Sequence, residues 1–220
     1  FASLRLVAVI DRTGMIDDPA GLDPDAMKRI IATKEEGRPL NSLTGGTATT
    51  PHDALASLVD RALIRPAIID ATADDTIGLL QMAADAGFDI VLANKRPMTA
   101  PLEEFAALET SMAHHGGRLR YEATVGAGLP LIVAVRQLIE TGDRITSLEG
   151  SLSGTLGFVL SAIESGVPFS EAIHEAMRQG MTEPDPRDDL SGADVGRKTL
   201  ILARMLGHRR ELEDIEIEGL

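Results

Sequence analysis

Short apolar runs alternate with helical segments through the middle of the chain, and this alternation limits the fold more than any other feature. Buried strands are predicted over residues 66–70, 89–93 and 119–123, with helices over 75–86 and 102–114 between them. Strands joined by helices at this spacing are typical of a parallel sheet. We therefore predict an α/β fold built on a doubly wound, Rossmann-like parallel sheet.

An earlier apolar run, residues 4–10, predicts another buried strand that ends at Asp11. In doubly wound sheets, ligands bind beyond the carboxyl ends of the strands. The predicted strand ends here carry Asp11, Asp70 to Thr72, and Asn94 with Lys95. We expect these residues to lie at the ligand-binding edge of one sheet.

The pattern changes near Gly126, where we predict a domain boundary. The predicted elements beyond it are helices over 131–140, 157–165 and 168–179 and a strand over 145–151. Residues 1–125 then form a dinucleotide-binding domain, and residues 126–212 form an α+β substrate and dimerisation domain. Residues 213–220 are predicted to form a strand that returns to the first domain.

Composition excludes several classes of protein. The 220 residues carry a formal net charge of -13, which argues against nucleic acid as a partner, because phosphate contacts need clustered lysine and arginine. The absence of cysteine excludes disulfides, thiolate metal sites and cysteine nucleophiles. No apolar run approaches twenty residues and no signal peptide is recognisable, so we expect no membrane span and a cytoplasmic location.

The stretch from Gly180 to Lys198 concentrates acidic side chains ahead of an apolar helix. Its acidic residues include Glu183, Asp185, Asp188, Asp189 and Asp194. Ser191 followed by Asp194 predicts a capping box, and Asp194 and Lys198 lie four residues apart on one helix face. A lysine on an apolar face needs a partner or a lowered pKa. A helix cap with a snorkelling lysine explains the pattern equally well, so both interpretations stay open.

Asp11 could bind the ribose hydroxyls of a dinucleotide, but that role requires a G-x-G-x-x-G turn about twenty residues earlier. Only ten residues precede Asp11. Either the glycine-rich turn lies upstream, or the chain does not bind a dinucleotide in the usual way, and Asp11 is a turn residue. Arg12 leaves the choice of cofactor open. Asp11 favours NAD, whereas the Arg12 side chain could bind the 2′-phosphate of NADP. Lys95 could reach a ligand or be a solvated loop residue.

Four motifs in register resemble the homoserine dehydrogenase family. They are Ala93-Asn94-Lys95-Arg96, YEATVGAGLP at 121–130, EGSLSGT at 149–155, and EPDPRDDLSGAD at 183–194 with Arg197-Lys198. The resemblance runs from about residue 4 to the end of the chain. It implies reversible reduction of L-aspartate 4-semialdehyde to L-homoserine with NADH or NADPH, in threonine and methionine biosynthesis, by a homodimer.

The resemblance also implies roles for single residues. Lys198 would donate the proton to the carbonyl oxygen, with Lys95 close to both substrate and nicotinamide. The implied substrate-binding residues are Glu183, Asp189, Asp194 and Thr155. The implied cofactor-binding residues are Thr72 and Gly180, beside Asp11, Arg12 and Lys95. The family can also bind a sodium ion through Glu122 and the backbone carbonyls of Val125, Ala127 and Leu129, and such oxygen ligands suit a hard cation.

The sequence departs from the family pattern at three places. The glycine-rich turn is missing, Met181 stands where the family more often has an aromatic residue, and the chain stops at Leu220 where homologues continue. We therefore expect a partial chain with an N-terminally incomplete cofactor domain, and activity in the complete protein only. The alternatives are a non-catalytic amino-acid-binding relic or a dehydrogenase of another amino-acid semialdehyde. Fusion to an aspartokinase stays open.

Overall fold

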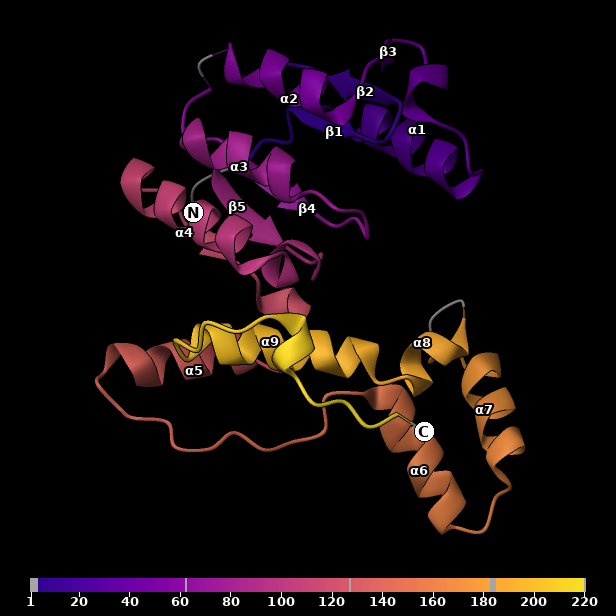
Figure 1. Cartoon of the computed structure of the whole chain (residues 1–220). Coiled ribbons are helices and arrows are strands. Elements are labelled where there is room, and N and C mark those ends of the chain that lie inside the picture. The colour runs from indigo at the N-terminus through magenta and orange to yellow at the C-terminus, as the bar shows by residue number, and fades with distance from the viewer. Residues whose placement is uncertain (1–3, 62, 127, 183–184, 220) are drawn as a thin grey trace. The chain divides into compact units, whose positions relative to one another are not determined.

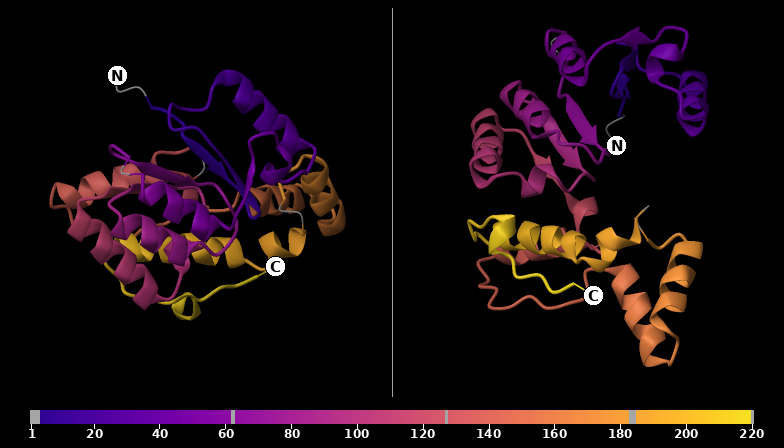
Figure 2. Two further views of the ribbon diagram at one scale, coloured as in Figure 1. Left: turned by 90° about the horizontal axis from the view of Figure 1, so that it is seen from above. Right: turned by 45° about the vertical axis from the view of Figure 1, so that its right-hand side comes forward.

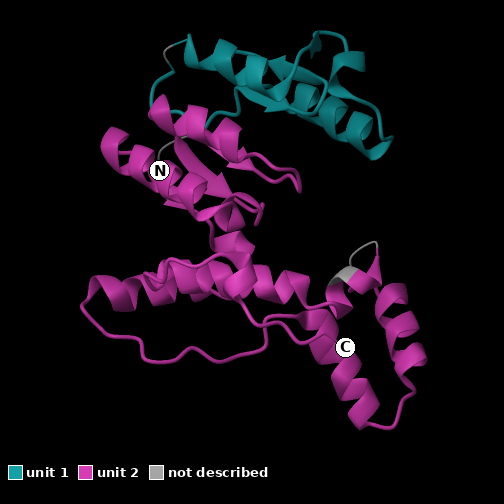
Figure 3. Cartoon of the chain, viewed as in Figure 1, with its two compact units in different colours: residues 1–66 teal, residues 67–220 magenta. Residues whose placement is uncertain are grey.

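The chain divides into two compact units, residues 1–66 and 67–220 (Figures 1 and 3). The computed structural model describes residues 4–61, 63–126, 128–182 and 185–219. The division falls earlier than the boundary predicted near Gly126. Within residues 67–220, Arg204 donates hydrogen bonds to the carbonyls of Met98 and Ala100, which lie more than a hundred residues earlier in the chain.

The first unit is a small antiparallel sheet with helices on both faces. Its strands are β1 (Ala8–Ile10), β2 (Gly14–Asp17) and β3 (Thr47–Ala48), and its helices are α1 (Pro24–Glu35), the 3-10 turn η1 (Leu40–Ser42) and α2 (Pro51–Val59). Met15 packs against Leu58 of α2, whereas Ile16, the next residue, packs against Ile30 of α1. This alternation follows from the strand geometry, which points successive side chains to opposite faces.

The strand predicted over 4–10 is shorter than expected and does not join the parallel sheet. β1 pairs antiparallel with β2, and Val9 lies opposite Ile16. The Asp11 carboxylate closes the hairpin turn, because it accepts hydrogen bonds from the backbone N–H groups of Thr13 and Gly14, both at 3.0 Å. The prediction that Asp11 ends a strand of the parallel sheet is therefore wrong.

The second unit contains the parallel sheet that the sequence predicted, which confirms the α/β class. Its strands are β4 (Ala67–Asp70), β5 (Asp89–Leu92) and β6 (Leu119–Arg120), in the order β4-β5-β6, and they are joined by α3 (Ile77–Asp85) and α4 (Leu102–His115). Ile90 and Leu92 are buried beneath these helices, whereas Ile69 and Val91 point to the other face and are exposed. Figure 2 shows α3 and α4 on the same side of the strands.

The rest of the second unit is helical. Its helices are α5 (Leu131–Glu140), α6 (Gly154–Glu164), α7 (Phe169–Arg178), α8 (Pro186–Leu190) and α9 (Ala193–Met205), and its 3-10 turns are η2 (Pro97–Thr99), η3 (Glu122–Thr124) and η4 (Leu212–Asp214). α6 and α7 form a hairpin around Val159, Ala172 and Ala176 (Figure 1). None of the described helices is both long and apolar enough to cross a membrane.

Two strands that the sequence predicted do not form. Residues 145–151 run as unpaired chain between α5 and α6, and residues 215–219 run as unpaired chain after η4. A strand needs a neighbour whose backbone groups complete the hydrogen-bond ladder. Among the described residues after Arg120 there is no such neighbour.

The acidic stretch before α9 is more ordered than a loop. Asp185 caps the short helix α8, since its side chain accepts a hydrogen bond from the backbone N–H of Arg187 at 3.0 Å. Gly192 precedes α9 with a φ of 72°, a left-handed conformation that favours glycine. The predicted capping box of Ser191 and Asp194 is wrong, because the Asp194 carboxylate pairs with two lysines instead.

Candidate active site

Asp194, in the first turn of α9, holds two lysines together. Its Oδ1 lies 2.5 Å from the Nζ of Lys95, and its Oδ2 lies 2.6 Å from the Nζ of Lys198. Burial acts to raise the pKa of Asp194, but hydrogen bonds and charge from Lys198 and Lys95 lower it more, so that the pKa lies below the usual 3.8. The carboxylate is therefore ionised at neutral pH and keeps two like charges side by side.

Lys198 points inward rather than to solvent. Its side chain is 17% exposed, and its Nζ also donates a hydrogen bond of 2.7 Å to the backbone carbonyl of Leu152. A snorkelling lysine would place its ammonium group in water. The structure thus favours the interpretation in which Lys198 is partnered on the buried side of α9.

A cavity of about 270 Å³ opens beside this ion pair. Its lining consists of Lys95, Ser153, Gly154, Thr155, Met181, Asp189, Asp194 and Lys198. The Ser153 hydroxyl caps α6 by accepting a hydrogen bond from the backbone N–H of Leu156, and this fixes the first turn of α6 at the cavity wall. The Thr155 hydroxyl donates a 2.6 Å hydrogen bond to the Met181 carbonyl. The α6 side of the cavity is thereby linked to the chain that leads into α8.

The structure brings together five of the residues that the sequence predicted at the site: Lys95, Lys198, Asp189, Asp194 and Thr155. Gly180, the residue before Met181, ends α7 with a φ of 67°. Glu183, a predicted substrate-binding residue, lies outside the described residues. The site therefore combines residues from the end of β5, from the start of α6 and from α8 and α9.

A buried polar network at the ends of β4 and β5 was not predicted. Asp70 and Asn94 are 5% and 3% exposed. The Asp70 carboxylate accepts hydrogen bonds from the hydroxyls of Thr72 and Thr76, at 2.8 and 2.6 Å, and from the Asn94 amide at 2.9 Å. The Asn94 Oδ1 accepts from the backbone N–H of Arg96 at 3.0 Å. The network consequently fixes the backbone on both sides of Lys95.

The sequence contained part of the signal for this network. Asp70 ends one predicted strand and Asn94 directly follows another, and parallel neighbours bring such positions together at one edge of the sheet. Thr76 carried no signal, because its role depends on how the connection between β4 and α3 folds back. Thr72 lies in the network, and its predicted contact with a cofactor stays a prediction.

Asp11 and Arg12 belong to the first unit, where Asp11 is fully engaged in local structure. Its Oδ2 accepts hydrogen bonds from the Nζ of Lys34 at 2.7 Å and from the backbone N–H of Leu40 at 2.9 Å. Burial acts to raise the pKa of Asp11, but the hydrogen bonds from Lys34, Thr13 and Leu40 lower it to about 2. These contacts are those of a structural turn residue. Cofactor binding by Asp11 and Arg12 stays a prediction.

Binding of the sodium ion that the resemblance implies stays a prediction. The Glu122 carboxylate pairs with Arg136 at 3.2 Å, and the Leu129 carbonyl accepts a hydrogen bond from the backbone N–H of Leu131. Val125 is buried, and Ala127 lies outside the described residues. Two of the four implied ligands, Glu122 and the Leu129 carbonyl, therefore have protein partners in this structure.

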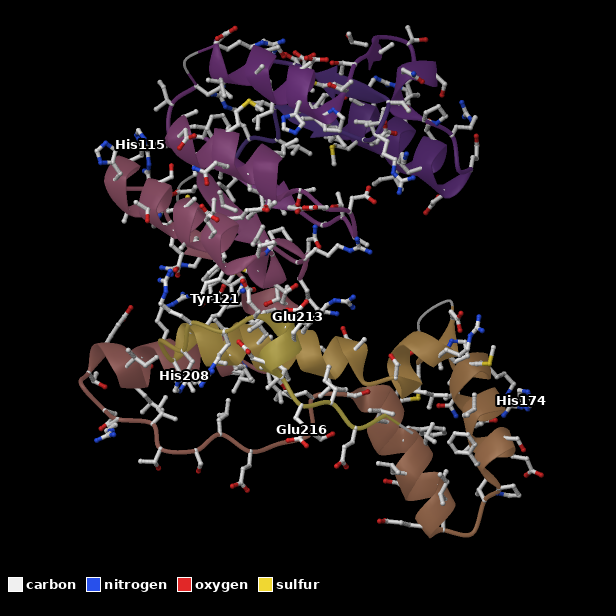
Figure 4. All side chains as sticks on the ribbon, in the orientation of Figure 1. His115, Tyr121, His174, His208, Glu213 and Glu216 are labelled. Atoms are coloured by element: carbon white, nitrogen blue, oxygen red, sulfur yellow. The ribbon has the colours of Figure 1, made fainter. Side chains whose placement is uncertain are left out.

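Histidines do not supply another metal centre in the part of the chain that the structure describes. In Figure 4, His115 ends α4, His174 lies on α7 and His208 follows α9, so that each points from a different element. No group of three or more histidine or acidic side chains among the described residues could hold a metal ion. The charged side chains that line the cavity are two lysines and two aspartates.

Comparison with known proteins places the chain in a family. A family model described as homoserine dehydrogenase matches residues 130–220. A bifunctional aspartokinase/homoserine dehydrogenase from Haemophilus influenzae is 36% identical over 219 residues, which are 99% of this chain and 25% of that protein. The chain belongs to the homoserine dehydrogenase family. It spans about a quarter of the length of this and another similar curated relative.

Solved structures of homoserine dehydrogenases share the fold. A putative homoserine dehydrogenase from Archaeoglobus fulgidus matches with a TM-score of 0.79 at 27% identity, over 98% of this chain and 62% of that chain. A hyperthermophilic archaeal homoserine dehydrogenase in complex with NADPH matches with a TM-score of 0.73 at 23% identity, over 90% of this chain and 59% of that one. The likeness to the second structure concerns the fold alone.

Proposed function

We propose that the protein to which this chain belongs interconverts L-homoserine and L-aspartate 4-semialdehyde by hydride transfer with NADPH or NADH. One observation carries this proposal: Asp194 holds the ammonium groups of Lys95 and Lys198 side by side at a polar cavity. Membership of the homoserine dehydrogenase family supports the choice of substrate. The cavity, at about 270 Å³, suits a molecule of amino-acid size.

Lys198 is the proton donor in this proposal. Reduction of the aldehyde places negative charge on the carbonyl oxygen, and a cation that also gives a proton lowers the barrier. Asp194 and the Leu152 carbonyl hold the Lys198 ammonium in place at 2.6 and 2.7 Å. In the reverse direction Lys198 acts as the neutral amine, and its nitrogen accepts the hydroxyl proton of homoserine. Lys95 adds a second positive charge at the same carboxylate.

The carboxylates bind the amino-acid part of the substrate. An ammonium group forms its strongest hydrogen bonds with carboxylates, and Asp189 and Asp194 both line the cavity. Thr155 contributes the polar wall next to them. Glu183 joins this set on the basis of the family resemblance.

The carboxyl edge of β4 and β5 fits the nicotinamide end of a cofactor. In α/β sheets this edge is the ligand-binding one, and Lys95 extends from it to the cavity. When bound, the cofactor supplies or accepts the hydride. Thr72 and Gly180 are its proposed contacts on this unit. Cofactor binding by Asp11 and Arg12 is a separate proposal, which rests on the family resemblance and on their position after the first apolar run. The NADPH complex of the archaeal relative supports NADP as the first cofactor to test. The expected homodimer stays a prediction.

The test is spectrophotometric oxidation of L-homoserine by the protein of native length, with NADP and NAD in separate assays. Homoserine-dependent formation of reduced cofactor is expected. A rate equal to that without enzyme would contradict the proposal. Calorimetry with homoserine alone then distinguishes a binding relic, which binds it tightly without turnover. Substrate profiling identifies a dehydrogenase of another semialdehyde.

A further inference from the structure

Arg204, near the end of α9, is buried and uses every donor of its guanidinium group. Its side chain is 1% exposed. The Nη1 donates to the carbonyls of Met98 and Ala100 at 3.0 and 2.8 Å, and the Nε and Nη2 donate to the Arg210 carbonyl. The Nη2 also donates to Glu211 at 3.0 Å. A guanidinium group has five N–H donors, so this side chain is fully satisfied.

Met98 and Ala100 belong to the segment that immediately follows Lys95. The Lys95 carbonyl accepts a hydrogen bond from the backbone N–H of Met98 at 3.1 Å, which makes Lys95 part of the η2 turn. The Met98 carbonyl in turn accepts from Arg204. One turn of backbone thus connects the buried arginine to the lysine at the cavity.

The same two segments meet at two points. At the cavity, Lys95 pairs with Asp194 across 99 residues of chain, and in the interior Arg204 binds Met98 across 106. Lys198 and Arg204 lie six residues apart on α9, which is about 9 Å along the helix axis. The contact between Lys95 and Asp194, which we call the outer contact, is partly exposed, with Lys95 at 27% and Asp194 at 21%. The contact between Arg204 and Met98, the inner contact, is buried.

We propose that Arg204 is a positioning residue that keeps Lys95 in register with Asp194 and Lys198 while substrate occupies the site. This inference rests on the proposed function. A substrate ammonium group competes with Lys95 for the Asp194 carboxylate, so the outer contact weakens during the reaction. The inner contact does not face the cavity and holds the two segments throughout. Lysine cannot replace arginine here, because it lacks the planar fork that reaches three carbonyls and a carboxylate together.

Glu211 connects Arg204 to the start of α4. Its Oε2 accepts from Arg204, and its Oε1 accepts from the backbone N–H of Leu102 at the start of α4 at 2.8 Å. The Arg204 guanidinium also lies 4.9 Å from the ring centroid of Phe105 on α4. The first turn of α4, the η2 turn and the end of α9 are therefore fixed around one side chain.

The experiment compares Arg204→Lys, Glu211→Gln and a matched core variant, Leu80→Ala, in the protein of native length. Leu80 is fully buried on α3 and touches none of these hydrogen bonds. For each variant, urea unfolding gives the folded fraction under assay conditions, and steady-state kinetics give kcat and KM for homoserine. A residue that merely stabilises the fold changes the folded fraction but not kcat per folded molecule.

We expect Arg204→Lys to lower kcat per folded molecule at least tenfold and by a larger factor than it raises KM, because small displacements of reacting groups cost large factors in rate. Leu80→Ala should leave kcat per folded molecule within twofold of wild type. A value within twofold for Arg204→Lys would overturn the inference. If Arg204→Lys does not fold, Glu211→Gln decides: at least a threefold loss supports the inference, and a smaller one overturns it. Failure of the proposed function has a separate readout, which is that the wild-type protein does not oxidise homoserine. In that case the inference is overturned as well.

Discussion

Asp194 and Lys198 lie one turn apart on α9, and their side chains meet at 2.6 Å, so this ion pair belongs to a single helix. A pair spaced i, i+4 forms wherever the helix forms. Lys95 joins the same carboxylate from a segment 99 residues earlier, and its contribution depends on the tertiary structure. The site thus has a local half and a long-range half, and these can be tested separately.

The local half is tested by Lys198→Ala. Loss of the proton donor should lower kcat by about 10²- to 10⁴-fold, the range typical of general acid catalysis. The measurement is steady-state homoserine oxidation, with Arg197→Ala as the matched control on the neighbouring residue of α9. Turnover of Lys198→Ala at more than half the wild-type rate would contradict the role of proton donor.

The shared carboxylate is tested by Asp194→Asn. The substitution keeps the shape of the side chain but leaves two ammonium groups adjacent without a compensating charge, so they should move apart. We expect kcat/KM for homoserine to fall by about 100-fold, since both proton transfer and ammonium binding are affected. Asp185→Asn, at the exposed cap of α8, is the control and should stay near wild type. Equal losses in the two variants would mean that the effect is not specific to the site.

Acid should weaken the first unit through Asp11. The pKa of Asp11 is about 2 in the folded chain, against 3.8 for the unperturbed group. Because the folded value is the lower one, the stabilisation is complete above about pH 4 and is lost as the pH falls towards 2. Asp11→Asn should therefore reduce the free energy of unfolding by about 1–2 kcal/mol at pH 6 and by much less at pH 2.5.

Urea unfolding at the two pH values measures this difference. Asp25→Asn removes an exposed partner of Lys28 and should cost little at either pH. A loss for Asp11→Asn that is the same at both pH values would show that the carboxylate charge is not what stabilises the turn.

Gly196 on α9 leaves room for Ile217. A Cβ added at Gly196 would overlap the Cδ1 of Ile217, so Gly196→Ala should destabilise the protein by about 1–3 kcal/mol despite the better helix propensity of alanine. Ile217→Val removes Cδ1, and the double variant should recover most of the loss. Gly157→Ala, on α6, meets only Ser151 at an ordinary 3.7 Å and should be neutral or slightly stabilising. Thermal unfolding of wild type and these variants measures the changes in stability. If the effects of Gly196→Ala and Ile217→Val simply add in the double variant, the contact is refuted.

The network behind Lys95 is tested at Thr76. Thr76→Val removes a donor to the buried Asp70 carboxylate, and an unsatisfied group of this kind costs about 1–3 kcal/mol. Thr76→Ser keeps the hydroxyl and should retain most of the stability. Thr110→Val, on the exposed face of α4, is the control and should change the free energy of unfolding by less than about 0.5 kcal/mol. If serine and valine at position 76 behave alike, the hydrogen bond is not important.

Local patterns in the sequence predicted much of the secondary structure. The helix predicted over 131–140 is α5 residue for residue, and the predicted alternation of strands and helices is the β4-β5-β6 sheet. The pair of Asp194 and Lys198 also followed from spacing alone. These features depend on residues that are close in sequence, where periodicity and spacing act directly.

Features that depend on distant partners were missed or misassigned. The run ending at Asp11 is apolar enough for a buried strand, but its partner is the antiparallel β2, and nothing local to the run specifies that choice. The stretch 145–151 has strand-like residues but no strand beside it among the described residues. Nothing in the sequence singled out Arg204, because most of its partners are backbone carbonyls, which any residue type can supply.

The cavity lining described above contains two lysines and two aspartates, so its formal charges cancel. The chain as a whole carries -13. A zwitterionic amino acid has no net charge either, and it should reach the cavity at a rate that ionic strength hardly changes. A phosphate-bearing cofactor approaches the same acidic molecule as an anion. Screening by salt, with a Debye length of about 10 Å at 0.1 M, should therefore speed its association while leaving that of the amino acid unchanged.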